Sequence, residues 1–331
     1  MKPNIVCLGG GTGTFVVLSG LVETECNLSA IVSMSDSGGS NKRIRDEFGL
    51  LPTSDIRQCL VALSREQGRA GLLRKLFMYR FEKGNGITGM TFGNLFMAAL
   101  SDILGSQKEA ICQTGKVLRI HGKVIPVSFT HTNLIATYDD GTVVSGEHEI
   151  DEPTQRKNVK IHKVKLSPPA LANGEAISSI KNADCIVIGP VDLYTSVIPN
   201  LLVNGIPEAI QTSKGICVYI VNLMTKNGQT LGYSASDHVR IVESYIGKRI
   251  NYVLFNTAPL PQNALRTYAS MSEYPVRDDL TDKTHYKVLR GDIVSDHVNT
   301  KSKSDQLIRS LIRHDGKKLA GMILSIINNS L

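Results

Sequence analysis

The chain has 331 residues, of which 42% are hydrophobic and 20% are charged, and its formal net charge is +7. This composition is typical of a globular protein and excludes a disordered one, and no apolar run reaches the roughly 18 residues that a membrane-spanning helix needs. The positive charge suits an anionic ligand or a nucleic acid. Because the chain has no Trp, only 5% aromatic residues and no zinc-finger or RNP-type motif, we do not expect a nucleic-acid-binding protein.

The six cysteines and the N-terminal segment predict a cytoplasmic protein. No Cys-x-x-Cys spacing occurs, which argues against a zinc site or a disulfide framework. Four of the cysteines lie inside apolar segments, as small buried hydrophobic residues do in a reducing compartment. The N-terminus has neither the basic flank nor the small-residue cleavage site of a signal peptide.

A glycine-rich turn follows the first expected strand. Residues 4–8 are a short apolar run, residues 14–23 are apolar enough for a packed helix, and between them stand Gly9, Gly10, Gly11, Thr12 and Gly13. Glycine lets the backbone approach a phosphate, and the first N–H groups of a helix attract anions. The turn therefore predicts a phosphate site. The dinucleotide fingerprint would need glycine at position 14, where this chain has Thr14, so a tight turn without a ligand is the alternative.

A second ligand-type loop follows the expected strand at residues 28–34. An acidic residue just past the second strand commonly binds a ribose or a metal ion, and Asp36 stands at that place. The loop continues as Gly38, Gly39 and Ser40, which favours an anion. An ordinary turn aspartate is the alternative for Asp36.

A helix is expected to begin near Asp55, capped by Thr53 or Ser54. Asp55 lies in its first turn and is either part of the cap or, together with Asp36, a ligand of Mg²⁺, which proteins usually hold on phosphates by one or two carboxylates. Arg57 is a candidate for neutralising phosphates. A solvated helix charge is the alternative for this arginine.

A third glycine-rich loop, at residues 84–89, leads into a strongly apolar helix from residue 92. It repeats the pattern of the first turn. Asn94 would lie in the first turn of the helix and could bond a base or a ribose, or could be a helix cap.

The pattern changes to alternation between residues 123 and 166. An Asp-Gly turn at residues 140–141 and the alternating segments around it predict a small antiparallel subdomain inserted into the α/β chain. The α/β rhythm returns at residue 183. We expect one α/β domain over residues 1–331, with this insertion and a basic helical tail at about 304–331, which reads as two helices separated by residues 314–316.

A further loop follows the strand that ends at Gly189. Gly-Pro at a strand end interrupts the ladder and opens a cleft, and Tyr194 and Ser196 would offer hydroxyl groups at its mouth. Open α/β sheets bind ligands at this edge.

Taken together, these loops resemble the bacterial gluconeogenesis factor family, relatives of the 2-phospho-L-lactate transferases. The resemblance runs from residue 4 to about residue 256. The motifs that carry it are Gly9-Gly10-Gly11-Thr12-Gly13, Asp36-Ser37-Gly38-Gly39-Ser40, Asp55-Ile56-Arg57, Phe92-Gly93-Asn94-Leu95-Phe96, Leu193-Tyr194-Thr195-Ser196 and Ala235-Ser236-Asp237-His238-Val239.

The resemblance implies a doubly wound, mostly parallel, Rossmann-like α/β fold with a nucleotide-type cleft. Its bacterial members are associated with growth on gluconeogenic carbon sources and with cell shape, and they bind UDP-sugars such as UDP-N-acetylglucosamine. The transferase relatives use Mg²⁺, whose aspartates would fall near Asp36 and on Asp55. The family usually has Asp-Asp-Gly-Gly, so Ser37 removes one carboxylate, and Asn41-Lys42 stands where Ser-Gly is usual. This departure weakens the case for metal-assisted transfer and favours binding without turnover.

Three functional hypotheses follow. The first is a cytosolic regulatory protein that binds a nucleotide sugar, with the diphosphate on Gly10 to Gly13, the ribose or base on Asn94, and the cleft closed by Tyr194 and Ser196. The second is a Mg²⁺-dependent transferase acting on a nucleotide-activated phosphate ester, with Arg57 neutralising the transferred group. The third is an NAD-dependent oxidoreductase, against which Thr14 argues. A protein partner would sense the bound ligand, and a homodimer is common for folds of this size.

Overall fold

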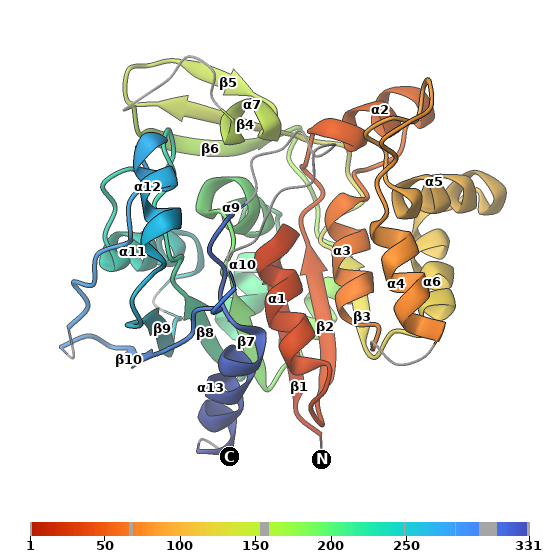
Figure 1. Cartoon of the computed structure of the whole chain (residues 1–331). Coiled ribbons are helices and arrows are strands. Elements are labelled where there is room, and N and C mark those ends of the chain that lie inside the picture. The colour runs from red at the N-terminus through yellow and green to blue at the C-terminus, as the bar shows by residue number, and fades with distance from the viewer. Residues whose placement is uncertain are drawn as a thin grey trace.

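The computed structural model describes residues 2–65, 69–152, 159–247, 249–281, 283–297 and 310–329, with the side chains of residues 39, 40, 69 and 70 left out of that description. Two sheets dominate these residues (Figure 1). The large sheet has seven strands in the order β10-β9-β8-β7-β1-β2-β3, and every pairing in it is parallel. The small sheet has three antiparallel strands. The predicted fold class is therefore confirmed.

The strands of the large sheet are short apolar segments, and most of them are almost completely buried. They are β1 (Asn4–Gly9), β2 (Asn27–Val32), β3 (Lys123–Pro126), β7 (Cys185–Ile188), β8 (Ile216–Ile220), β9 (Tyr252–Asn256) and β10 (Lys287–Gly291). Such runs are typical of a parallel sheet that helices cover on both faces. After β1 the chain winds outward through β2 and β3, and from β7 it winds the other way. The switch point therefore lies between β1 and β7, where open α/β sheets bind ligands.

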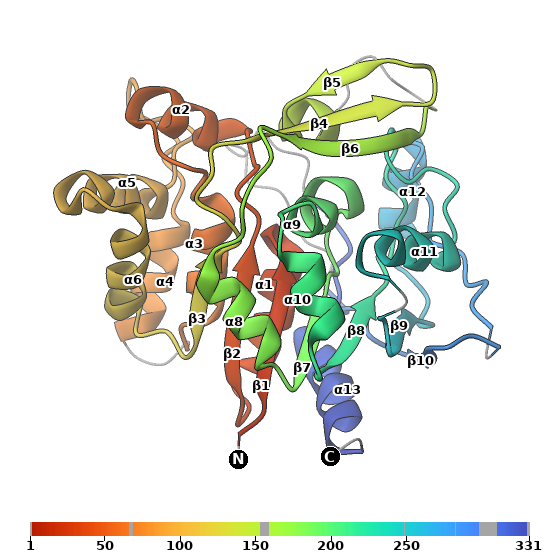
Figure 2. The ribbon, with the colours of Figure 1, turned by 180° about the vertical axis from the view of Figure 1, so that it is seen from behind.

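The helices form a layer on each face of the large sheet (Figures 1 and 2). One face carries α1 (Gly11–Leu21), α3 (Ser54–Ala62) and α13 (Gly316–Asn328). The other carries α8 (Gly174–Lys181) and α10 (Ile206–Thr212). At the crossing of α1 and α13, a Cβ atom on Gly20 would lie 1.9 Å from the carbonyl oxygen of Gly316. These two helices therefore pack backbone against backbone.

The remaining helices lie toward the edges of the large sheet and between the two sheets. They are α2 (Gly39–Phe48), α4 (Arg69–Met78), α5 (Phe92–Leu104), α6 (Gln107–Leu118), α7 (Glu147–Asp151), α9 (Ile198–Leu201), α11 (Ala235–Ile246) and α12 (Gln262–Ser270), with the π-helical turn η1 (Leu193–Val197) leading into α9. No helix in the described ranges has the length and apolarity to cross a membrane.

The small sheet lies across the carboxyl edge of the large one (Figures 1 and 2). Its strands are β4 (Asn133–Tyr138), β5 (Val143–Ser145) and β6 (Ile161–Ser167), in the order β5-β4-β6, and α7 is connected to β5. The segment 123–126, which we expected in the antiparallel subdomain, belongs instead to the large sheet as β3, because it pairs in parallel with β2. The small sheet therefore begins at Asn133.

The C-terminal tail contains one described helix. Asp315 caps α13 by accepting a hydrogen bond from the Lys318 N–H over 2.9 Å. The start of this helix matches the predicted break at residues 314–316. Most of the helix predicted before that break, at residues 304–309, lies outside the described residues.

Candidate functional site

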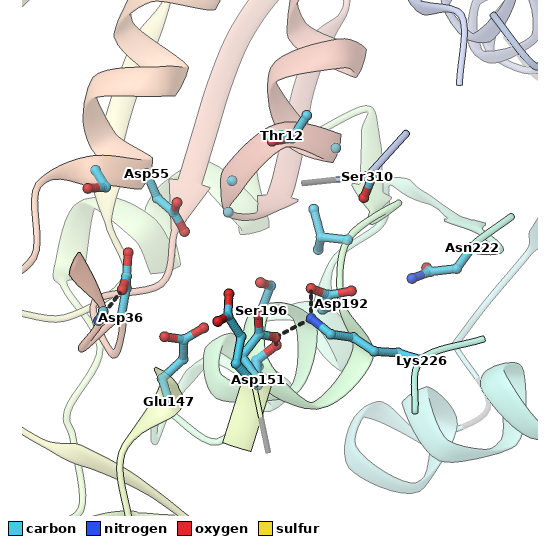
Figure 3. A pocket seen from close by; sticks show the side chains of 18 of the residues that line it. Thr12, Asp36, Asp55, Glu147, Asp151, Asp192, Ser196, Asn222, Lys226 and Ser310 are labelled. Carbon is cyan, nitrogen blue, oxygen red and sulfur yellow. Dashed lines mark hydrogen bonds and ion pairs between the residues drawn. The ribbon is translucent and has the colours of Figure 1, made fainter. Parts of the chain in front are cut away.

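A cavity of about 780 Å³ opens at the switch point, between the carboxyl edge of the large sheet and helix α7. Its lining comes from helices α1, α2, α3 and α7, the loops after β2, β7 and β8, the end of α12, and residues within 80–90 and 310–314. Figure 3 shows the side chains that point into it. The volume lies within the usual range of about 300–1,000 Å³ for small-molecule sites.

The predicted glycine turn forms one wall of the cavity. Gly10, Gly11, Thr12 and Gly13 all line it. Helix α1 begins at Gly11, which has φ +59°, and its N-cap is Gly10, which has no side chain that could cap the first N–H groups. Such orphan amides and the positive end of the helix dipole form a site for an anion.

Two glycines of the turn have packing roles. A Cβ atom on Gly13 would lie 1.5 Å from the carbonyl oxygen of Pro190, so only glycine allows α1 to approach the loop after β7. Gly9 lies outside the lining, and its carbonyl accepts hydrogen bonds from Ser33 N–H over 3.2 Å and from Asn200 Nδ2 over 3.1 Å. The turn is thus held on both sides by backbone contacts.

Asp55 lies directly against the glycine turn. A Cβ atom on Gly10 would be 2.3 Å from Oδ2 of Asp55, and one on Gly11 would be 3.6 Å from Oδ1. The carboxylate therefore shares the positive helix end with any phosphate that binds there. The carboxylate of Asp55 and a bound phosphate would repel each other unless a cation lay between them.

Asp36 points into the same cavity (Figure 3). Its Oδ1 accepts a hydrogen bond from Gly38 N–H over 2.8 Å, and its Oδ2 accepts one from Asn41 Nδ2. Asn41 Oδ1 in turn accepts hydrogen bonds from Thr53 N–H over 3.0 Å and from Ser54 N–H over 3.2 Å, at the start of α3. Asn41 therefore links the Asp36 loop to the helix that carries Asp55.

The other members of the second predicted loop lie close by. Gly38 lines the cavity. Gly39 and Ser40 form the first turn of α2, and the positions of their side chains lie outside the described part of the chain. Ser37 accepts a hydrogen bond through Oγ from His148 N–H over 3.1 Å. The loop is thereby tied to α7, across the cavity.

Helix α7 adds acidic groups that the sequence analysis did not identify. Glu147 Oε2 accepts a hydrogen bond from Ser37 N–H over 3.4 Å. Burial raises the pKa of Glu147 well above its usual value, and the charges of Asp36 and Asp151 raise it further. Burial likewise raises the pKa of Asp36, against the effect of the Gly38 hydrogen bond. This end of the cavity therefore holds partly buried carboxylates that a cation would stabilise.

Arg57 and Asn94 lie behind the lining of the cavity. Their exposed fractions are 3% and 0%. Arg57 Nε donates to Asn94 Oδ1 over 2.9 Å, and Asn94 Nδ2 donates to Ser54 Oγ over 3.0 Å. Ser54 itself lines the cavity. The contacts with a ligand that we expected for Arg57 and Asn94 remain predictions. In the structure, the hydrogen bonds of these two residues hold Ser54 in place from the protein side.

The predicted loop after β7 also has some residues in the lining of the cavity and others behind it. Ser196 lines the cavity, whereas Gly189 and Tyr194 do not, although Pro190 next to Gly189 does. Gly189 has φ +79°, which favours glycine at this strand end. Tyr194 is 3% exposed, and its hydroxyl lies 3.0 Å from that of Tyr233. Its role as a closing group over the ligand remains a prediction.

A lysine in the lining of the cavity, Lys226, is the main residue that the sequence did not reveal. Lys226 Nζ lies 2.5 Å from Asp151 Oδ1 and 2.9 Å from Asp192 Oδ2 (Figure 3). Burial acts to lower the pKa of Lys226, but the two aspartates outweigh it and raise that pKa, so the side chain is charged. Asp192 and Lys226 follow β7 and β8 in the sequence. Their place at strand ends was the signal that could have revealed them.

The end of the cavity beyond Lys226 carries polar atoms with no protein partner among the described residues. They are Asn222 Oδ1, Asn227 Oδ1 and His314 Nε2, and all three residues line the cavity. Burial lowers the pKa of His314 to about 4, so its ring is neutral at pH 7. Buried polar atoms are almost always hydrogen-bonded. This end is therefore suited to a ligand that supplies hydrogen-bond partners.

The charges of the lining decide what an anionic ligand would need. In the part of the chain that the structure describes, seven Asp and Glu residues line the cavity against four Lys and Arg residues. No group of three or more His, Cys, Asp and Glu side chains among the described residues is placed to hold a metal ion by itself. Mg²⁺ usually binds through one or two carboxylates together with substrate phosphates. Asp36 and Asp55, beside the glycine turn, fit that donor set.

Comparison with known proteins agrees with the fold. The family model of 2-phospho-L-lactate transferase CofD matches residues 5–294. A putative gluconeogenesis factor of Nostoc sp. is 41% identical over 97% of this chain and 68% of its own length, and the gluconeogenesis factor of Bacillus subtilis is 39% identical over 98% of both chains. A crystal structure of a protein from Bacillus halodurans superposes with a TM-score of 0.87 at 38% identity, covering 98% of this chain and 100% of that one.

Proposed function

The chain belongs to the family of 2-phospho-L-lactate transferase CofD, and within it to the bacterial gluconeogenesis factors, and we propose that its cavity binds a nucleotide sugar of the UDP-N-acetylglucosamine type. In this proposal the protein is a cytoplasmic regulator linked to growth on gluconeogenic carbon sources and to cell shape. Binding, rather than turnover, carries the function. A protein partner would sense the occupied state.

The observation that carries the proposal is the N-terminus of α1 in the wall of the cavity. Gly10 to Gly13 expose their backbone there, next to about 780 Å³ of space. A diphosphate offers several anionic oxygens to orphan N–H groups, and this is the favoured use of a strand-glycine-helix turn at a switch point.

The end of the cavity with Asn222 and His314 supports a base on one side of the diphosphate. An amide side chain offers one acceptor and two donors. Uracil presents an N–H between two carbonyl groups, which matches an amide whose Oδ1 has no partner in the described protein. Tyr268 and Arg313 also line this end and offer a ring and a cation to the nucleoside.

The opposite end, with Asp36 and Asp55, supports a bound divalent cation. These two side chains would hold Mg²⁺, which when bound would neutralise the diphosphate and orient it. Without the cation, the phosphate and Asp55 would share the start of α1 and repel each other. We therefore expect Mg²⁺ to strengthen nucleotide binding.

The alternative function is that of the transferase relatives. The matching family model carries the name of a transferase, and the Asp36 and Asp55 pair would suit a Mg²⁺-dependent transfer of a phosphate ester. Arg43 lines the cavity, so the neutralising role foreseen for Arg57 would fall to Arg43. Ser37, in place of the family's usual aspartate, argues for binding without transfer.

The test is ligand binding by calorimetry and thermal shift. UDP-N-acetylglucosamine, UDP, GDP and NAD are compared, each with and without Mg²⁺. We expect the uridine compounds to bind and GDP and NAD to bind at least about tenfold more weakly, a difference of about 1.4 kcal/mol. Binding of GDP alone, and only with Mg²⁺, would favour the transferase. Binding of none would refute the proposal.

A pair of variants ties the binding to the glycine turn. Thr12→Tyr places a bulky ring in the cavity beside the amides and should abolish binding. Thr281→Tyr is the matched control, because Thr281 is exposed and does not line the cavity. Unchanged affinity in Thr12→Tyr would remove the turn from the proposal.

A further inference from the structure

Lys226 and its two aspartates form a polar triad inside the cavity, and we define the sugar triad as Asp151, Asp192 and Lys226. The three side chains come from α7, from the loop after β7 and from the loop after β8. Lys226 joins the two carboxylates at 2.5 Å and 2.9 Å. All three residues line the cavity, and Figure 3 shows them grouped together beside Ser196.

The triad is held rigidly from one side. Asp151 Oδ1 accepts hydrogen bonds from Thr195 Oγ1 over 3.0 Å and from Gln229 Nε2 over 3.1 Å, in addition to Lys226. Burial acts to raise the pKa of Asp151, but Lys226, Thr195 and Gln229 outweigh it and hold that pKa below its usual value. The carboxylate is therefore ionised and fixed in place before any ligand arrives.

The triad keeps unused hydrogen-bonding capacity. Within the described residues, the donors that reach the two carboxylates bind Asp151 Oδ1 and Asp192 Oδ2, and Lys226 Nζ donates to two acceptors although an ammonium group has three N–H donors. Asp151 and Asp192 also interact with each other, and burial together with this contact raises the pKa of Asp192 against the effect of Lys226. The triad thus has acceptor oxygens and one N–H donor left for a ligand.

The sign of the charge limits which ligand group can bind here. Two acidic side chains and one ammonium group give no excess of positive charge, which disfavours a further phosphate. Hydroxyl groups are neutral, donate to carboxylates and accept from ammonium groups. Charge-assisted hydrogen bonds of this kind are roughly twice as strong as neutral ones, and an acidic side chain beside a ribose hydroxyl is common in nucleotide sites.

We propose that the sugar triad binds vicinal hydroxyl groups of a sugar ring in the ligand and selects ligands that carry them. The inference rests on the proposed function, since it names what the same cavity recognises beside the diphosphate. Asp151 and Asp192 accept from two neighbouring hydroxyls, and Lys226 donates to one of their oxygens. The ring is either the ribose of the nucleotide or the sugar beyond the diphosphate.

The experiment measures three affinities for each variant by calorimetry. The ligands are UDP-N-acetylglucosamine, UDP and 2′-deoxy-UDP, all with Mg²⁺. The variants are Asp192→Ala and Lys226→Met, and the matched controls are Asp46→Ala and Lys123→Met. Asp46 is an exposed acid, and Lys123 has an exposed ion pair with Glu175 at 3.3 Å.

The pattern of losses identifies the ring. If the triad binds the sugar beyond the diphosphate, Asp192→Ala weakens UDP-N-acetylglucosamine at least tenfold and leaves UDP within twofold. If it binds the ribose, the variant weakens UDP at least tenfold and leaves 2′-deoxy-UDP within twofold. Either pattern supports the proposal. Equal losses for all three ligands, or no loss for any, would overturn it.

Two further comparisons keep the test decisive. If Asp192→Ala does not fold, Asp192→Asn preserves the shape and is measured in the same way. If the triad only connects α7 to the loop after β7, its substitution would lower the melting temperature without changing the ratio of the affinities for the three ligands. If the wild-type protein binds none of the uridine compounds, the proposed function fails, whereas a failure of the triad alone leaves wild-type binding intact.

Discussion

Two glycine-rich loops look alike in the sequence and differ in the structure. The first glycine loop is Gly9 to Gly13, and the second glycine loop is Gly84 to Gly89; each leads toward an apolar helix. Both touch the cavity. The first loop presents the start of α1 to it, whereas Thr88, Gly89 and Met90 of the second segment line it ahead of the start of α5, and Asn94 in α5 is fully buried.

The difference follows from what precedes each loop. The first loop comes directly from the carboxyl end of β1, at the switch point of the large sheet, so its helix starts where ligands bind. The second loop follows helix α4 instead of a strand, and an antiparallel β-bridge between Arg80 and Thr91 joins the two ends of the segment that contains it. A glycine-rich loop before a helix thus predicts an anion site here only when a buried strand comes immediately before it.

The largest effect is expected for Gly13→Ala in the first loop. The added Cβ atom would lie 1.5 Å from the carbonyl oxygen and 2.7 Å from the carbonyl carbon of Pro190, and backbone atoms cannot move aside cheaply. We expect a loss of about 3 kcal/mol in the free energy of unfolding, at the upper end for overpacking, measured by urea denaturation. Nucleotide binding should be lost as well.

Gly321→Ala is the matched control for this substitution. A Cβ atom on Gly321 meets nothing within 4 Å in helix α13, so the change should be neutral or stabilising by up to about 1 kcal/mol. A Gly13→Ala protein as stable as the wild type would mean that α1 and the Pro190 loop do not pack as described.

The second largest effect is expected for Asn94→Ala, beside the second loop. The change removes the acceptor of Arg57 Nε and the donor to Ser54 Oγ inside the protein. We expect a loss of about 2 kcal/mol in unfolding free energy, because a hydrogen bond to a charged group is worth about 1.5–3 kcal/mol. The affinity of the folded protein for UDP should stay within about twofold.

Asn85→Ala in the exposed part of the second loop serves as the control and should change stability by less than about 0.5 kcal/mol. The opposite result would support the contact between Asn94 and the ligand that the sequence predicted. If Asn94→Ala keeps full stability but weakens UDP binding more than tenfold, Asn94 reaches the ligand.

The sequence predicted elements and strand-end loops better than it predicted which side chains face the cavity. Gly10 to Gly13, Asp36 and Ser196 line the cavity because each lies at the carboxyl edge of a predicted strand, and Asp55 lies in the helix turn beside that edge. Arg57 and Tyr194 lie within a few residues of lining positions but point into the protein. Helical rotation places neighbours on different faces, and only tertiary packing decides which face meets the cavity.

The missed residues and the misplaced strand have physical reasons too. Lys226 and His314 reach the cavity from strand-end and tail segments far apart in the chain, so no local pattern joins them to Asp151. The run at 123–126 is short and apolar, and such a run does not indicate whether its partner is parallel or antiparallel. The pairing of β3 with β2 is set by the return of the chain through α6.

A smaller effect is expected for Asp55→Asn, which removes the carboxylate next to the first loop. With Mg²⁺ present, the loss of a cation ligand should weaken UDP binding about tenfold, equivalent to about 1.4 kcal/mol. With a chelator instead, binding should become tighter, because the repulsion between the carboxylate and the diphosphate is gone. Calorimetry in both buffers measures the two signs.

Asp46→Asn, an exposed change on α2, is the control for that experiment and should leave both affinities unchanged. The same direction of change with and without Mg²⁺ would show that Asp55 acts by shape rather than by charge. The first loop would then bind its anion without a cation.

The smallest effect is expected at Glu273, which lines the cavity but belongs to neither glycine loop. Its substitution therefore shows how much a change elsewhere in the cavity affects stability. Burial raises the pKa of Glu273 to about 7 from 4.5, against the opposing charge of Lys226. Between these two values the folded protein keeps a proton that the unfolded chain has released, so stability falls as the pH rises through this window. Because the side chain is partly exposed, the cost is about 1 kcal/mol. Glu273→Gln should therefore unfold at higher urea than the wild type at pH 8 and equally at pH 4.5, whereas Glu23→Gln, at an exposed position, should match the wild type at both. An equal gain at both pH values would trace the effect to packing rather than to titration of this carboxyl group.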